Sequence, residues 1–254
     1  MRDTFIKQND YFDRAIQENR NLFQNSLERL KNNKIKNENI QHAKHLISFD
    51  AIQILISMYS RGDSMNELKE EFSKVLKYME DGWDDSVVKF KMGKAQVILD
   101  QYWLNDYCYM IWMLSLAILL KVSFDEIAIL KKLIEQGKIS DELILFLLGN
   151  LVNHKYSNLS KTTYKPFHAI ITKQGFDNID SKHIKKYLDN WYKNTKLLTW
   201  HNYLNSVENG NFSYFGYWSF ESAAIVAIMD LDDSSFKDNP NYPKDLVDYY
   251  RANI

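Results

Sequence analysis

The chain has 254 residues with a formal net charge of -1, of which 45% are hydrophobic and 26% are charged. This is the composition of a globular protein, and it excludes the strong basic excess typical of proteins that bind nucleic acid or anionic membranes. The sequence holds 8 glycines and 3 prolines, a shortage that predicts long helices with short connections. Cys108 is the single cysteine, so no intramolecular disulfide can form, and its apolar neighbours favour a core position.

Apolar residues recur at helical spacing along most of the chain, and we find no convincing strand alternation. The expected helices cover residues 10–31, 41–60, 64–78, 86–104, 106–121, 123–136, 140–149, 166–173, 181–194, 196–208, 219–229 and 243–250. The sequence therefore predicts an all-α fold, a multi-helix bundle without significant sheet. We expect two helical subdomains packed together, residues 1–122 and 123–254.

Polar residues mark several of the expected helix ends. Ser64 to Glu67 and Ser123 to Glu126 both match the capping box, in which a serine and a glutamate satisfy each other's backbone N–H groups. Gly137 suits a left-handed residue after a helix. Ser140 and Ser219 are expected to begin helices as N-caps.

Charge is distributed unevenly over the chain. Residues Asp63 to Asp85 and Ser219 to Asp248 each carry a net charge of -5, whereas Lys155 to Lys196 carries +6. Charged residues on solvent-exposed helix faces would explain the net charge of each segment. The alternative is that one or both acidic segments face a basic partner, because opposite charges speed and orient encounter.

No pattern in the chain indicates catalysis or metal binding. His42 and His45 could share a helix face, but further ligands from a facing helix are missing. The segment from Asp230 resembles a calcium loop but has Ser235 and Asn241 where glycine and glutamate are required. The sequence holds no glycine-rich phosphate loop, nucleophile elbow or cysteine cluster. We expect no catalytic residues, no metal and no cofactor.

An aromatic stretch precedes an apolar helix and an acidic loop near the C-terminus. Gly216 permits a backbone turn, and Tyr217 and Trp218 are expected to pack against the helix. Ser219 is the expected N-cap, and Glu221 lies in the first turn, where a carboxylate favours the helix dipole. The following loop is held between this helix and the Pro243 segment, so it would lose little entropy on binding.

The sequence of this region resembles a known family. The stretch "YFGYWSFESAAIVAIMDLDDSSFKDNPNYPKDLVDYYR", residues 214–251, resembles the C-terminal signature of the PoNi immunity proteins. "YLDNWY" (187–192) and "SLAILLKVSFDEIAIL" (115–130) are similar to the same family. "MRDTFIKQNDYFDRAIQ" and "SMYSRGDSMNELKEEF" resemble its N-terminal domain more loosely.

The resemblance implies a cytoplasmic, all-helical inhibitor rather than an enzyme. PoNi proteins are the cognate inhibitors of PoNe-type DNase toxins, which bacteria deliver by contact-dependent systems, notably type VI secretion. The implied partner is thus a DNase toxin protein, with no direct contact to nucleic acid or membrane.

An acidic surface would suit a toxin that holds DNA with basic residues. On that argument the expected toxin-binding residues are Asp232, Asp233, Asp238, Asp84 and Asp85. The residues expected to support the surface are Gly216, Tyr217, Trp218, Ser219 and Glu221.

Two other functions remain open from the sequence. An enzyme could use Glu221 and the loop aspartates on a small substrate. A helical scaffold without a toxin partner would need none of these groups. Exposed aromatic residues would also favour a homodimer.

Overall fold

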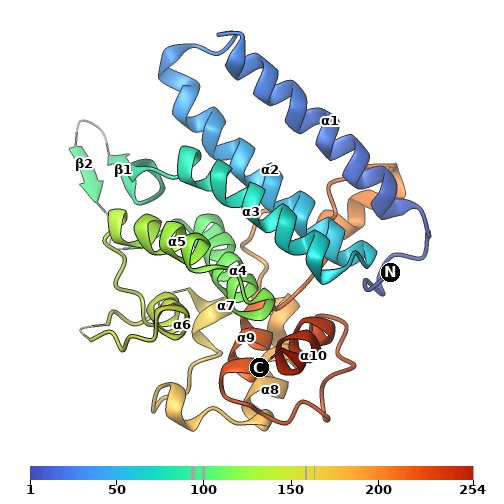
Figure 1. Cartoon of the computed structure of the whole chain (residues 1–254), viewed down its shortest axis with the longest axis vertical. Coiled ribbons are helices and arrows are strands. Elements are labelled where there is room, and N and C mark those ends of the chain that lie inside the picture. Colours follow the sequence, from blue (N-terminus) through green and yellow to red (C-terminus); the bar gives the residue numbers. More distant parts are fainter. Residues whose placement is uncertain (93–94, 99–100, 158, 163, 254) are drawn as a thin grey trace. The chain divides into compact units, whose positions relative to one another are not determined.

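The computed structural model describes residues 1–92, 95–98, 101–157, 159–162 and 164–253. Two compact units divide the chain, Met1–Val87 with Asn202–Gly216 and Val88–His201 with Tyr217–Ile254. Nearly all described secondary structure is helical (Figure 1), which confirms the all-α prediction. The expected division between residues 122 and 123 stays a prediction.

The first unit is built on three long helices, of which α2 packs against both others (Figure 1). They are α1 (Tyr11–Lys31), α2 (Ile40–Arg61) and α3 (Met65–Gly82), and the unit also contains the 3-10 turns η1 (Asn37–Asn39), η2 (Asp85–Val87) and η4 (Tyr203–Asn209). A Cβ on Gly82 would lie 2.6 Å from the carbonyl oxygen of Lys44, so α2 and α3 approach too closely here for any other residue.

Residues 202–216 complete the first unit, although more than a hundred residues separate them from α3 along the chain. The buried carboxylate of Asp3 accepts hydrogen bonds from the backbone of Phe5 and Ile6 and from the Tyr214 hydroxyl at 2.7 Å. Ser60 donates to the carbonyl oxygen of Phe215, also at 2.7 Å. These bonds fix the N-terminal segment and the late segment in one structure.

The second unit surrounds the apolar helix α4 (Leu104–Leu120), which packs against α6, α9 and α10. Cys108 is fully buried, as expected. The other elements are α5 (Phe124–Gln136), α6 (Glu142–Val152), α7 (Lys165–His168), η3 (Phe176–Asn178), α8 (Ser181–Asn194), α9 (Phe220–Ile228) and α10 (Lys244–Ala252). No helix among the described residues is long and apolar enough to cross a membrane.

The helix predicted over residues 86–104 is wrong for residues 89–92 and 95–98, and its residues 93–94 and 99–100 lie outside those that the structure describes. Lys89–Met92 and Ala95–Ile98 form antiparallel strands, β1 and β2, with Phe90 opposite Val97. The alternation of lysine with Phe90 and Met92 is the period-two signal of a strand, which the helical reading overlooked. The helices predicted over 166–173 and 196–208 shorten to the single turn α7 and the 3-10 segment η4.

Some of the predicted helix ends are confirmed and others are wrong. Both capping boxes, Ser64 with Glu67 and Ser123 with Glu126, are present. Gly137 instead has a right-handed φ of -72°, and the next residue, Lys138, takes the left-handed position with φ 53°. Asp141 rather than Ser140 caps α6, because its carboxylate accepts from the backbone N–H groups of Leu143 and Ile144.

Candidate functional site

Glu221 lies at the centre of a buried polar network in the second unit. Its side chain has no exposed surface, and Oε1 accepts three hydrogen bonds. The donors are the Tyr187 hydroxyl at 2.8 Å, Trp191 Nε1 at 2.6 Å and the Ser219 hydroxyl at 2.7 Å. The network thus joins α8 to the start of α9.

Burial controls the ionisation of this carboxyl group. Loss of water raises the pKa of Glu221, and the bonds from Ser219, Tyr187 and Trp191 oppose the rise. Oε2 has no hydrogen-bond partner among the described residues. The group is sealed from solvent, so no substrate can reach it, and its expected role in supporting the acidic surface stays a prediction.

The aromatic stretch before α9 is tied to the loop that follows this helix. The backbone N–H of Ser219 donates to the carbonyl oxygen of Asn241 at 2.8 Å, and the Asn241 side-chain amide donates to the carbonyl oxygen of Tyr217 at 2.9 Å. Gly216 has φ 115°, a conformation that favours glycine. Tyr217 and Trp218 are buried. Ser219 precedes α9, but its hydroxyl binds Glu221 instead of capping the helix.

Asp233 is engaged inside the acidic loop. Its carboxylate accepts from Arg251 Nη1 at 3.1 Å and from the Tyr242 hydroxyl at 3.0 Å, and only 13% of the side chain is exposed. Arg251 also donates to the carbonyl oxygen of Leu231. These bonds hold the loop against α10, so Asp233 shapes the loop.

Asp232 and Asp238 lie on the outside of the same loop. Asp232 is exposed and accepts from the backbone and hydroxyl of Ser234, bonds that lower its pKa. Asp238 pairs with Lys244 at 3.1 Å, with 82% of its side chain exposed. Both carboxylates can therefore meet a partner without rearrangement of the loop.

Asp84 and Asp85 follow α3 in the first unit and are exposed. Asp84 accepts from the backbone and hydroxyl of Ser86 at 2.8 and 2.6 Å, which fixes the turn. The exposed acids Glu70 and Glu80 extend the negative charge along α3. The two predicted acidic groups thus occupy different units, each on a locally ordered turn.

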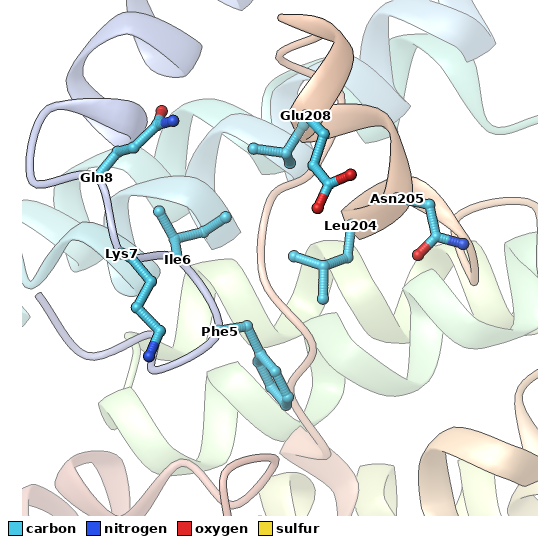
Figure 2. A pocket seen from close by; sticks show the side chains of 8 residues that line it. Phe5, Ile6, Lys7, Gln8, Leu204, Asn205 and Glu208 are labelled. Carbon is cyan, nitrogen blue, oxygen red and sulfur yellow. The ribbon is translucent and has the colours of Figure 1, made fainter.

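A pocket of about 440 Å³ opens between the N-terminal segment and η4 of the first unit. Figure 2 shows Phe5, Ile6 and Lys7 on one side and Leu204 and Glu208 on the other. Its lining is mainly apolar, and its rim carries one acid and one base. Lys7 and Glu208 are both exposed, so neither charge selects an occupant for this pocket.

Within the described part of the chain, no group of three or more histidine, cysteine, aspartate or glutamate side chains could hold a metal ion. His42 and His45 accordingly gain no third ligand there. Cys108 is fully buried, and burial raises the pKa of its thiol, which keeps it protonated and unreactive.

Two of the contacts that define the core came from residues that sequence reasoning did not connect. Tyr187 and Trp191 belong to "YLDNWY" and meet Glu221 from about thirty positions away along the chain. Their spacing of four places them on one face of α8. That spacing, opposite a lone acid in an apolar helix, was the available signal.

Comparison with known proteins gives a fold and a family. The crystal structure of protein PA2201 from Pseudomonas aeruginosa is similar with a TM-score of 0.62 and 18% identity, over 84% of this chain and 76% of that one. At this identity the likeness concerns the fold alone. No curated protein sequence matches the chain.

Two family models match nearly the whole chain. Residues 2–134 match the N-terminal model of the PoNe immunity proteins, and residues 139–246 match the C-terminal model of the same family. The second match contains the Glu221 network and the acidic loop. The chain therefore belongs to the family of PoNe immunity proteins (PoNi).

Proposed function

We propose that this protein binds its cognate PoNe toxin, a DNase delivered by a type VI or related secretion system, and neutralises it by direct contact in the cytoplasm. Membership of the immunity family across residues 2–134 and 139–246 is the observation that carries the proposal. A cognate nuclease toxin as partner follows from that membership. The sequence resemblance implies that the inhibited reaction is DNA cleavage.

The contact surface in this proposal is acidic. Asp232 and Asp238 on the loop before α10, and Asp84 and Asp85 after α3, are exposed on turns whose backbone is already hydrogen-bonded. A nuclease that holds the phosphate backbone presents lysine and arginine side chains. Negative charge on ordered turns attracts such a surface and loses little entropy on binding.

A cleavage assay tests the proposal. The toxin domain is incubated with DNA and titrated with the immunity protein, and we expect cleavage to stop at a fixed molar ratio. Undiminished cleavage with both proteins folded would overturn the proposed function.

Charge reversal then locates the surface. Asp84→Lys with Asp85→Lys, and separately Asp232→Lys with Asp238→Lys, should each slow association in proportion to their share of the contact. Glu18→Lys with Glu28→Lys on α1 is the matched control, because both residues are exposed acids outside these turns. Equal loss in all three double variants would indicate a general effect of charge rather than a defined interface.

The enzyme alternative has no support in the family or the site. PoNe immunity proteins are toxin inhibitors and not enzymes. Glu221, the acid that this alternative required, is fully buried. Asp233, which would have assisted it, is bonded to Arg251 and Tyr242.

A further inference from the structure

A second pocket of the first unit, of about 370 Å³, lies between the end of α1 and the start of α2. Ile35, Leu46 and Ile47 give it an apolar wall, and Leu46 keeps 47% of its side chain exposed there. Arg29 and His42, both exposed, also line it. Asp50 is the one acid in its lining.

Asp50 differs from the other partly buried acids of this unit. Asp3 and Glu71 have hydrogen bonds or ion pairs with neighbouring groups. Burial raises the pKa of Asp50 to about 6, and neither Arg29 nor His42 offsets this rise. Its carboxylate therefore loses water without gaining a hydrogen bond or a cation from the described residues.

Such a group lowers the stability of the free protein at neutral pH. An uncompensated carboxylate beside apolar side chains is unfavourable, and an alanine or asparagine would relieve the penalty. Groups whose ionisation is penalised in a pocket are typical of binding sites, where the partner supplies the missing interaction. The apolar wall of the pocket and the acid within it thus fit a ligand with an apolar stem and a positive end.

We propose that this pocket receives one arginine or lysine side chain of the toxin, with its carbon chain along Leu46 and Ile47 and its cationic group at Asp50. The proposal rests on the proposed function, because it assumes the toxin as partner. Both side chains combine an apolar stem with a charged head. A surface that binds DNA phosphates is rich in them.

Arg29 and His42 test the sign of the occupant's charge. Both lie at the same pocket. The positive end of the ligand gains no attraction from them and binds at Asp50. Arg29→Gln should therefore leave toxin affinity unchanged or raise it slightly. A loss of affinity in Arg29→Gln would indicate an acidic ligand and overturn the proposed occupant.

The main experiment measures toxin affinity and thermal stability of the full-length protein side by side. Asp50→Asn should weaken toxin binding by about 30-fold or more, because a desolvated cation would lose its counter-charge. The same variant should melt at or above the wild-type temperature. A residue with only a structural role would not lower affinity while raising stability.

Two matched controls complete the test. Glu18→Gln removes an exposed acid of α1 outside the pocket and should leave affinity unchanged. Leu46→Ala should weaken binding by about five-fold, whereas Leu22→Ala, at a leucine that is 62% exposed on α1, should not.

The outcomes separate the two proposals. If the wild-type protein fails to bind or inhibit the toxin, the proposed function fails. If the wild-type protein binds and Asp50→Asn binds equally tightly, only the pocket inference is wrong.

Discussion

Glu221 is a fully buried carboxyl group and Asp50 is a partly buried one, and the two differ in their hydrogen-bond partners. The pKa of each is raised by desolvation. Glu221 receives three hydrogen bonds within 2.8 Å and has no exposed surface. Asp50 receives none from the described residues and lines an open pocket. Oε1 of Glu221 is satisfied by the fold, although Oε2 is not, whereas the Asp50 carboxylate has no donor from the described residues.

The comparison teaches how to separate structural acids from binding acids in an acidic inhibitor. A buried carboxylate with internal donors contributes to stability, and its removal leaves those donors unpaired. One without donors lowers stability, so its presence needs another explanation. By this criterion Asp233 is a structural acid like Glu221, since Arg251 and Tyr242 donate hydrogen bonds to its carboxylate.

Removal of the Glu221 carboxylate should have the largest effect. Glu221→Ala leaves the hydroxyls of Tyr187 and Ser219 and the Trp191 N–H without their acceptor, and should lower the free energy of unfolding by about 3–5 kcal/mol. Urea denaturation measures it. Glu221→Gln keeps an acceptor oxygen and should lose less. Stability within about 1 kcal/mol of wild type in Glu221→Ala would break the comparison.

The loop aspartates should divide in the same way. Asp233→Ala removes a partly buried pair with Arg251 and a bond from Tyr242, and should lower the free energy of unfolding by about 1–3 kcal/mol. Asp238→Ala removes an exposed pair with Lys244 and should change it by about 0.5 kcal/mol or less. Equal effects, measured in parallel denaturation curves, would mean that Asp233 is not structural.

Asp50→Asn should have a smaller effect than Asp233→Ala, with the opposite sign. The folded-state pKa is raised, so the folded protein binds a proton more tightly than the unfolded chain does, and wild-type stability falls as pH rises from about 4 to about 6. Above that range Asp50→Asn should be more stable than wild type by about 1–2 kcal/mol.

The difference in unfolding free energy between wild type and Asp50→Asn is the quantity to measure, because His42 and Arg29 at the same pocket are present in both proteins. Denaturation at pH 4, 5, 6 and 7 measures it. If the stability difference between the two proteins does not increase with pH, Asp50 is solvated or paired in solution.

Local features of this fold were readable from the sequence. The capping boxes at Ser64 and Ser123 depend on residues three positions apart, so the sequence alone determines them. The long amphipathic helices α1 and α3 follow from their apolar spacing. The β1–β2 hairpin was missed because two four-residue strands give a signal too short to override a helical expectation.

The arrangement of the acids was not readable in the same way. Asp232 and Asp233 are neighbours of the same type, and only the fold brings Arg251 and Tyr242 to one of them. The contacts of Glu221 with Tyr187 and Trp191 depend on how α8 and α9 pack. Asp50 stands alone within "LISFDAIQIL", an apolar segment of α2, and that isolation was its one signal.

The order in which the chain is synthesised gives the late segment of the first unit a further meaning. Asp3 leaves the ribosome 211 residues ahead of its partner Tyr214. Until that tyrosine emerges, Asp3 has the backbone N–H groups of Phe5 and Ile6 but lacks the hydroxyl donor, and Ser60 lacks the carbonyl oxygen of Phe215. The first unit is therefore closed only after residues 202–216 have been added to its N-terminal helices. An immunity protein built this way keeps its first unit incomplete while residues 88–201 of the second unit are synthesised.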